Sequence, residues 1–236
     1  MLASESAKLK LMSFIKENNY QVGDMLPSET QLSDNLGVSR LTLREAINVL
    51  KSNGVVRPVQ GKGTFIAADI DQIEDSLNSN ISITDMIHAG GFVAGTKYCK
   101  KELVTAGNEL AEKLDIHEGD NVVACTRIRT ADGIPVVYSE DYLAPRIVPG
   151  FLTMADENIS LFRFIEENEN IRMGVSDTEI RPAKADALLA GLLEIEEGEL
   201  LMEFLITIRD EEGVPLIWAR EFLKPDTFRF VVHRIK

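Results

Sequence analysis

Two pairs of arginines in this chain have a spacing that places both members against one partner. Arg40 and Arg44 are four residues apart, so in a helix they share one face. Arg127 and Arg129 are two residues apart, so in a strand they point to the same side. A guanidinium presents a fork of N–H donors that fits phosphate, carboxylate or the O6 and N7 atoms of guanine. The first pair therefore suggests contact with a base edge, and the second suggests the binding of an anion.

The first 68 residues have the pattern of short helices followed by a hairpin. Ser28 and Gln31 form a capping box at one helix start, and Gly37 is a typical helix end. The glycine-rich tip over 60–63 separates two β-rich segments. The expected elements are helices over 2–18, 28–36 and 40–53 and strands over 55–59 and 64–67. Helix, helix, tight turn, helix and hairpin is the order of a winged helix-turn-helix.

In a helix-turn-helix, the N-terminal part of the second motif helix contacts base edges in the major groove. That helix begins at Ser39 here, and the helix start at Ser28 offers free N–H groups to a phosphate. The candidate DNA-binding residues are Ser28, Ser39, Arg40, Thr42, Arg44, Gly61 and Lys62. We assign Leu41, Leu43, Ile47 and Leu50 to packing. Each feature alone is also typical of a solvated face, a plain turn or a protein-interaction module, but their order and spacing favour DNA.

The composition is that of a globular protein with unevenly placed charge. The chain has 236 residues, 44% of them hydrophobic, and a formal net charge of −13. Residues 1–68 contain eight basic and six acidic side chains, whereas the remainder contains 17 basic and 32 acidic ones. Because local charge steers a partner, a slightly basic head on an acidic body is compatible with DNA binding.

Several other classes of protein are disfavoured. Cys99 and Cys125 form neither a disulfide framework nor a metal-type spacing. The three histidines, His88, His117 and His233, are scattered and suggest no metal, and we expect no cofactor. No apolar run approaches the ~20 residues that span a bilayer. The N-terminus alternates apolar and charged residues, unlike a signal peptide, so we expect a cytoplasmic protein with no membrane partner.

The second part of the chain contains an internal repeat. Residues 69–80 are acidic and polar and are predicted to form a linker and hinge. Beyond them, the run over 127–145 is matched by the run over 207–225, including the Gly-x-Pro pattern at Gly133 and Gly213. Each repeat unit reads as helix, turn, strand, turn, strand. Two such units predict an α+β domain over 81–236, an antiparallel sheet with helices on one side.

The second domain also carries candidate residues for a small ligand. Arg127 and Arg129 repel each other on one sheet face unless an anion or an acid lies between them. Tyr138 and Glu140 share a face of the paired strand, and Ser160 begins an apolar helical stretch whose N-terminus could hold a phosphate. The candidate effector-binding residues are Arg127, Arg129, Tyr138, Glu140, Ser160 and Phe162. The alternative is that the two arginines pair with acids on the sheet surface.

The residues from Gly23 to Phe65 resemble the DNA-binding domain of the GntR family of bacterial transcription regulators. The resemblance rests on the runs Leu26-Pro27-Ser28-Glu29, Leu36-Gly37-Val38-Ser39-Arg40, Thr42-Leu43-Arg44-Glu45-Ala46 and Gln60-Gly61-Lys62-Gly63-Thr64-Phe65. It covers about residues 4–68 and implies DNA contacts at the seven positions named above. Many members carry Arg where this chain has Thr30, so the contact made there by relatives is not carried over.

Residues 81–236 resemble the UTRA effector-binding domain of HutC-type GntR regulators, which shares its fold with chorismate lyase. The resemblance rests on Arg127-Ile128-Arg129, Ala131-Asp132-Gly133-Ile134-Pro135 with Glu140, Ser160-Leu161-Phe162, and the segment from Gly213-Val214-Pro215 to Phe230. It implies that the double Arg and a Ser-Leu-Tyr motif hold phosphate and that the acid holds sugar hydroxyls. Phe162 replaces that Tyr, and Ile217 replaces a second acid, which indicates a more apolar site or a different ligand.

The leading interpretation is a homodimeric transcription regulator, with repression favoured. It would bind a pseudo-palindromic DNA operator and respond to a small polar or anionic effector such as a sugar phosphate. Two alternatives stay open. One is a chorismate-lyase-like enzyme with a DNA-binding head, although no catalytic triad or paired-carboxylate arrangement is evident. The other is a dimerisation platform that binds no ligand.

Overall fold

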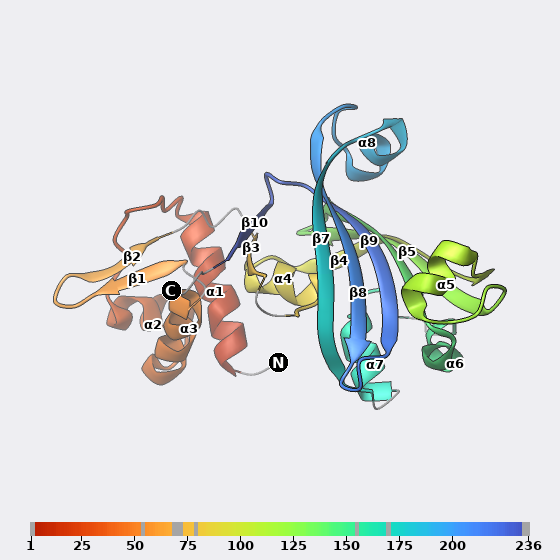
Figure 1. The fold of residues 1–236 in the computed structure, drawn as a ribbon. Coiled ribbons are helices and arrows are strands. Elements are labelled where there is room, and N and C mark those ends of the chain that lie inside the picture. Colours follow the sequence, from red (N-terminus) through yellow and green to blue (C-terminus); the bar gives the residue numbers. More distant parts are fainter. Residues whose placement is uncertain are drawn as a thin grey trace. The chain divides into compact units, whose positions relative to one another are not determined.

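The computed structural model describes residues 3–52, 55–67, 73–77, 80–153, 156–168 and 171–232. The chain divides into two compact units (Figure 1). The N-terminal unit consists of Met1–Ser76 with Met86–Phe92 and Arg229–Lys236, and the C-terminal unit of Leu77–Asp85 with Val93–Phe228. Each unit is therefore built from more than one segment, whereas the sequence predicts the three consecutive segments 1–68, 69–80 and 81–236.

The N-terminal unit begins with the element order of a winged helix-turn-helix. The elements are α1 (Ala3–Glu17), α2 (Glu29–Leu36), α3 (Arg40–Ser52) and the antiparallel strands β1 (Val56–Val59) and β2 (Gly63–Ile66). Local residues set the helix ends. Ser28 and Gln31 form the predicted capping box at α2, and Gly37 ends α2 in the left-handed region with φ 63°.

One apolar core holds these elements together. Its buried members come from the three helices, the hairpin and the segments next to them: Leu11, Met12, Ile15, Leu26, Leu32, Leu43, Ile47, Leu50, Val55, Val56 and Ile66. Leu43, Ile47 and Leu50 lie at helical spacing on one side of α3, as predicted. The packing role predicted for Leu41 is wrong, because two residues along a helix lead to its other side and Leu41 is 71% exposed.

A short strand lies inside the segment that the sequence predicts as a linker. Strand β3 (Ile73–Ser76) pairs with β10 (Phe228–Val231) in a two-stranded sheet. The rest of the predicted hinge falls largely on residues 69–72 and 78–79, outside the described residues. The strand escapes prediction because its partner lies about 150 residues away and the acidic composition of 69–80 is typical of a loop.

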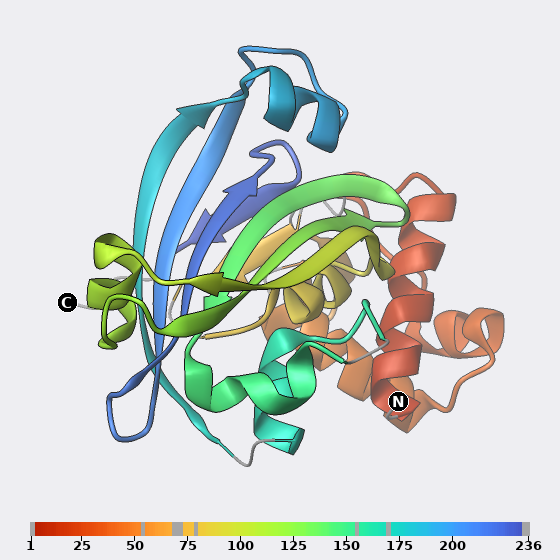
Figure 2. The same ribbon diagram turned by 90° about the vertical axis from the view of Figure 1, so that its right-hand side faces the viewer.

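The C-terminal unit is built on a six-stranded antiparallel sheet in the order β4-β5-β6-β9-β8-β7 (Figures 1 and 2). The strands are β4 (Ala94–Thr105), β5 (Asn121–Ala131), β6 (Ile134–Leu143), β7 (Met173–Lys184), β8 (Leu200–Asp210) and β9 (Pro215–Leu223). The predicted repeat appears as two similar halves, β4-α5-β5-β6 and β7-α8-β8-β9. They meet at the central β6–β9 pair.

Helices cover both faces of this sheet. The repeat helices α5 (Asn108–Leu114) and α8 (Ala187–Leu193) pack on one face, the α5/α8 face, with Tyr138, Trp218 and Phe222. The helices α6 (Val148–Phe151) and α7 (Leu161–Asn168) pack on the other, the α7 face, with Cys125 and Ile217. The prediction of helices on one side holds for the repeat helices alone, because α6 and α7 lie in the segment between the repeats. The short helices α4 (Ile83–Ala89) and η1 (Pro145–Ile147) complete the chain's described helices.

Candidate functional site

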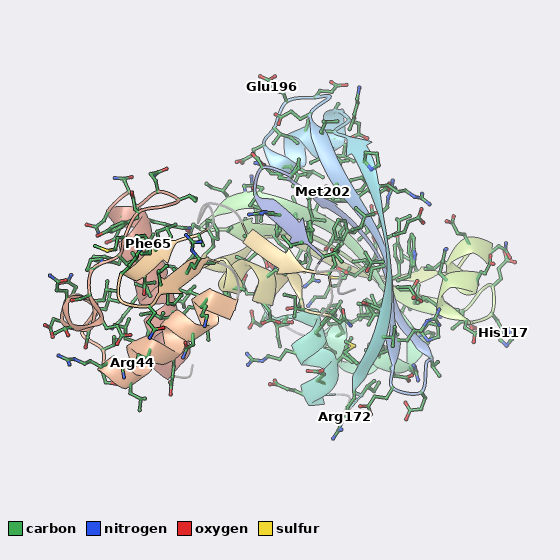
Figure 3. All side chains as sticks on the ribbon, turned by 60° about the vertical axis from the view of Figure 1, so that its left-hand side comes forward. Arg44, Phe65, His117, Arg172, Glu196 and Met202 are labelled. Carbon is green, nitrogen blue, oxygen red and sulfur yellow. The ribbon has the colours of Figure 1, made fainter. Side chains whose placement is uncertain are left out.

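The candidate DNA-binding residues lie at the surface of the N-terminal unit. They come from the start of α3, the turn before α2 and the tip of the β1–β2 hairpin. Ser28, Ser39, Arg40, Arg44, Gly61 and Lys62 are exposed and Thr42 is half-buried. Figure 3 shows Arg44 on the helices of this unit and Phe65 on its hairpin. The apolar residues beneath them hold these positions in place.

The first turn of α3 is ordered by hydroxyl groups. Ser39 Oγ accepts a hydrogen bond from the backbone N–H of Thr42 at 3.1 Å, and the two hydroxyls lie 2.7 Å apart. Arg44 Nε donates to Glu29 Oε2 on α2 at 2.6 Å. Arg40 forms no hydrogen bond or ion pair with another described residue, so its guanidinium is available to a ligand.

The hairpin tip places a cation on a narrow turn. Gly61 has φ 74° and Gly63 has φ 128°, backbone conformations that favour glycine. Lys62 lies between them, exposed, and its backbone N–H donates to the Val59 carbonyl at 3.0 Å. The tip can therefore bring the Lys62 ammonium group and the backbone of the two glycines close to the phosphate backbone of a nucleic acid.

The candidate effector residues do not all share one face of the C-terminal sheet. Arg127 lies opposite Ser139, and Arg129 lies opposite Val137, on the α7 face. Tyr138 and Glu140 lie opposite Ile128 and Thr126 instead. Because neighbouring strand residues point to opposite faces, Tyr138 and Glu140 belong to the α5/α8 face. Their predicted grouping with the two arginines is therefore corrected.

A one-residue irregularity in the hairpin causes this difference. The register shifts between Arg129 and Thr130, so Thr130 lies opposite Pro135 and Arg129 opposite Val137. Without this irregularity, Arg127 would lie opposite Tyr138. A register shift of one residue moves every side chain of β6 to the other face relative to β5, so Ser139 takes that place. On its own face, the Tyr138 hydroxyl donates to Glu140 Oε1 at 2.8 Å.

Arg127 is buried and paired with an acid. Its Nη2 donates to Asp141 Oδ2 at 3.1 Å, and Ser139 Oγ donates to the same oxygen at 3.1 Å. Burial acts to lower the pKa of Arg127, but the charge and hydrogen bond of Asp141 together with the nearby Cys125 and Cys99 outweigh it, and the net shift is upward. The alternative that an acid neutralises an arginine therefore holds for Arg127.

Arg129 is buried without an acid. It is 1% exposed, and it donates from Nη1 to Thr96 Oγ1 at 2.7 Å and from Nη2 to Thr84 Oγ1 at 2.8 Å. Its Nε has no partner among the described residues, and neither has Nε of Arg127. Burial and the like charge of Arg127 lower the pKa of Arg129 to about 10. A buried cation without a counter-charge is unfavourable, and a bound anion would remove the penalty.

The segment before α7 approaches Arg129 indirectly. The Thr96 hydroxyl, which accepts from Arg129, donates to the Glu157 carbonyl at 2.9 Å. Ser160 is buried and accepts from the Arg163 N–H at 3.4 Å, and Phe162 packs on the apolar cluster of the α7 face. In the described part of the chain, Ser160 forms no hydrogen bond with either arginine.

Sequence reasoning misses five polar residues of the α7 face or its rim: Thr84, Thr96, Ser139, Asp141 and Glu221. Ser139 and Asp141 each follow a member of the predicted pair, Tyr138 and Glu140, by one residue on β6. They therefore face the other side of the sheet, and their role depends on the hairpin irregularity, which the sequence does not reveal. Thr84 and Thr96 are brought to Arg129 by tertiary packing alone. Only the repeat offers a signal for Glu221, because it occupies the position that Asp141 has in the first half.

Two further observations bear on the class of site. No three His, Cys, Asp or Glu side chains of the described residues lie together in a way that could hold a metal ion. Within the same ranges, no helix has the length and apolar character needed to cross a membrane.

Comparison with known families matches both parts of the chain. The profile of the UTRA domain matches residues 89–229, and that of the gntR family of bacterial regulatory proteins matches residues 3–66. The chain is similar to the HTH-type transcriptional repressor NagR of Bacillus subtilis strain 168, with 26% identity over 222 residues, 94% of this chain and 90% of the relative. It is also similar to the probable fructoselysine utilization operon transcriptional repressor of Escherichia coli strain K12, with 27% identity over 227 residues, 96% of this chain and 92% of the relative.

Solved structures share the fold. PhnF from Mycobacterium smegmatis has a TM-score of 0.67 at 24% identity, over 96% of this chain and 99% of that one. The possible transcriptional regulator YydK from Bacillus subtilis has a TM-score of 0.60 at 24% identity, over the whole of both chains. The predicted α+β fold with an N-terminal winged helix-turn-helix is therefore confirmed.

Proposed function

The chain belongs to the gntR family of bacterial regulatory proteins and carries a UTRA domain, and on this premise we propose that it is a homodimeric, ligand-responsive repressor. Its two heads would bind a pseudo-palindromic operator, and a small polar or anionic metabolite such as a sugar phosphate would modulate that binding. The matched families and named relatives are regulators rather than enzymes, so the chorismate-lyase alternative is set aside.

The proposal for DNA rests on the start of α3. Arg40 is exposed and unpaired among the described residues, on a turn that Ser39 and Thr42 hold in shape. An arginine in this position can donate two hydrogen bonds to one guanine. Lys62 on the hairpin tip and the helix start at Ser28 would contact phosphates, which adds affinity but little sequence preference.

The proposal for an effector rests on one observation, the buried and acid-free guanidinium of Arg129. An anion bound there would gain from the low polarity of its surroundings. Two relatives are named as repressors, one of them for fructoselysine utilization, which supports repression and a sugar-derived ligand. Phe162 and the buried Ile217 belong to the apolar cluster of this face.

The effector must favour one conformation of the dimer in order to act. Only a difference in its affinity for two conformations can change the affinity of the heads for DNA. We propose that the ligand lowers operator affinity, so that repression is relieved when the metabolite accumulates. Size-exclusion chromatography with light scattering would test the homodimer, and a monomer at operator-binding concentration would contradict it.

The test begins with selection of binding sites from randomised duplexes by the full-length protein. Arg40→Ala should lower affinity for the selected site by ten- to a hundredfold, about 1–3 kcal/mol, and broaden its sequence preference. Lys51→Ala, at the last turn of the same helix, is the matched control and should keep the preference. Unchanged affinity and preference in Arg40→Ala, with a normal melting temperature, would contradict the proposed DNA interface.

The effector is tested by thermal shift and by release from the selected duplex. A sugar phosphate that binds the folded protein must raise its melting temperature by mass action. Arg129→Gln should abolish that rise, whereas Arg181→Gln, an exposed arginine of β7, should keep it. A wild type that responds to no member of a metabolite panel would support the ligand-free platform instead.

A further inference from the structure

We propose that Glu221 binds a protonated amine of the same ligand whose anionic group binds Arg129, so that the effector is a small zwitterionic metabolite. This inference rests on the proposed effector function and assigns its ligand class. It is carried by a second buried ionisable group on the α7 face, a carboxyl that forms no hydrogen bond or ion pair with the described residues.

Glu221 lies on β9, where none of its described neighbours forms a hydrogen bond or ion pair with its carboxyl group. It is 8% exposed and lies opposite Ser139 on β6 and opposite Phe204 on β8, on the α7 face. In the described part of the chain, its carboxyl group forms no hydrogen bond or ion pair. A buried carboxyl without a partner is unfavourable by about 1–3 kcal/mol, so its presence calls for a function or a ligand.

The two halves of the sheet show what Glu221 lacks. Asp141 lies opposite Cys125, and Glu221 lies opposite Phe204, at equivalent places in the two hairpins. The hairpin irregularities follow Arg129 in one half and Ile208 in the other. The residue two positions before the irregularity is therefore Arg127 on β5, and the equivalent residue on β8 is Ile206. The acid is present in both halves, and its basic partner in only one.

The α7 face thus holds two buried groups that lack a counter-charge, besides the neutral pair of Arg127 and Asp141. Arg129 is a cation without an acid, and Glu221 is an acid without a base. They do not pair with each other among the described residues, where two strand spacings and a two-residue step separate their Cα atoms by roughly 12 Å. One ligand that carries an anion at one end and an ammonium at the other would satisfy both.

The surroundings of Glu221 suit an ammonium group. Burial, and then the Asp141 carboxylate, raise the pKa of Glu221 to about 8 against the smaller opposing effect of the Arg127 charge, so Glu221 is protonated at neutral pH until a bound cation stabilises its charge. An amine-free ligand would not gain this interaction.

The experiment uses matched pairs of probes on the full-length protein. The pairs are phosphoethanolamine with ethyl phosphate, glucosamine 6-phosphate with glucose 6-phosphate, and 6-aminohexanoate with hexanoate. Melting temperature and calorimetric affinity are measured at about pH 7 with up to ~10 mM probe. In at least one pair, the amine-bearing member should bind tenfold or more tightly than its partner.

The variants separate the two ends of the ligand. Glu221→Gln should reduce the amine preference to less than threefold, with the loss falling on the amine-bearing member. Glu203→Gln is the matched control, since Glu203 is equally buried on the neighbouring strand but faces the other way and pairs with Arg220. It should keep the preference. Arg129→Gln should weaken both members of the pair.

The outcomes distinguish this inference from the proposed function. Equal binding of both members, an unchanged preference in Glu221→Gln, or no amine-bearing probe bound would overturn the zwitterionic ligand. Binding of amine-free anions that is lost in Arg129→Gln would, in the same data, leave the anion-responsive regulator standing. If Glu221→Gln does not fold, Glu221→Asp keeps the test, because the amine preference should fall and the charge type is retained.

Discussion

The two units each contain an arginine–carboxylate pair, and the pairs differ in their surroundings. Arg44 and Glu29 meet at 2.6 Å with side chains that are 64% and 41% exposed. Arg127 and Asp141 meet at 3.1 Å with side chains that are 10% and 5% exposed. Water screens the first pair, so either partner is easily given up to another ligand. The second pair is bound into the sheet, where loss of one partner strands a buried charge.

This contrast fits the two ligands that we propose. A DNA backbone offers a row of phosphates, so exposed cations such as Arg40 and Lys62 can engage it without prior desolvation of the site. A small metabolite offers few groups, and its recognition depends on the strong interactions of a site that excludes water. Exposed charges therefore suit the binding of many DNA phosphates by the N-terminal unit, and buried charges suit the selective binding of one small metabolite by the C-terminal unit.

The largest effect should come from breaking the buried pair. Asp141→Ala leaves Arg127 without its acid and should lower the free energy of unfolding by about 3–5 kcal/mol. Glu29→Ala, which removes the exposed acid, should lower it by less than about 1 kcal/mol. Urea unfolding followed by fluorescence of Trp218, the one tryptophan of the chain, reports the first variant directly. Circular dichroism reports the second.

Equal losses in the two variants would remove the distinction between the pairs. A small loss in Asp141→Ala would mean that water reaches Arg127 once the acid is gone. The variant Asp141→Asn controls for packing, since it keeps the shape of the side chain and removes its charge. We expect it to lose nearly as much stability as Asp141→Ala.

The second largest effect should be a pH dependence that the buried acid imposes. The pKa of Glu221 is raised from 4.5 to about 8. Below 4.5 the carboxyl is protonated in folded and unfolded chains alike, and stability does not depend on it. Above 4.5 the unfolded chain ionises while the folded one stays protonated, so stability falls as the pH rises towards 8. Relative to Glu221→Gln, the wild type should lose about 2.5 kcal/mol of unfolding free energy between pH 5 and pH 7.

The measurement is the free energy of unfolding of both proteins at each pH. If it changed with pH by the same amount in the wild type and in Glu221→Gln, Glu221 would titrate normally, and the proposed effect of its burial would be wrong. Glu203→Gln serves again as the control, because Arg220 already compensates that acid. A saturating amine-bearing ligand should flatten the wild-type curve, since it stabilises the ionised carboxylate.

The N-terminal unit could be predicted from sequence because its signals are local. The capping box of Ser28 and Gln31, the helix end at Gly37 and the glycine-flanked tip at Lys62 each depend on residues within a few positions of one another. The helices and the hairpin follow from them. The packing role predicted for Leu41 is wrong because an apolar residue on a helix suggests burial, whereas its position relative to Leu43 decides the face.

The candidate effector site could be predicted only in part. The two arginines share a face because alternation within one strand is local. Which residues of the next strand join them depends on the register, and one irregular position moves Tyr138 and Glu140 to the opposite side. The pairing of β3 with β10 and the contact of Thr84 with Arg129 depend on the tertiary fold. No pattern in a single stretch of sequence contains that information.

The smallest effect should come from the exposed side of α3, where Leu41 stands beside Arg40. An apolar side chain that is 71% exposed at the start of this helix can contact the methyl group of a thymine in the major groove. Leu41→Ser should weaken binding to the selected operator by about 1 kcal/mol, roughly fivefold, and Val49→Ser, an exposed apolar residue two turns later, should not. In a duplex whose contacted thymine is replaced by deoxyuridine, the wild type should lose the same amount and Leu41→Ser nothing more. If the losses from the substitution and from the missing methyl group add in full, Leu41 does not contact that methyl, and base discrimination in the head comes from its charged and hydroxyl side chains alone.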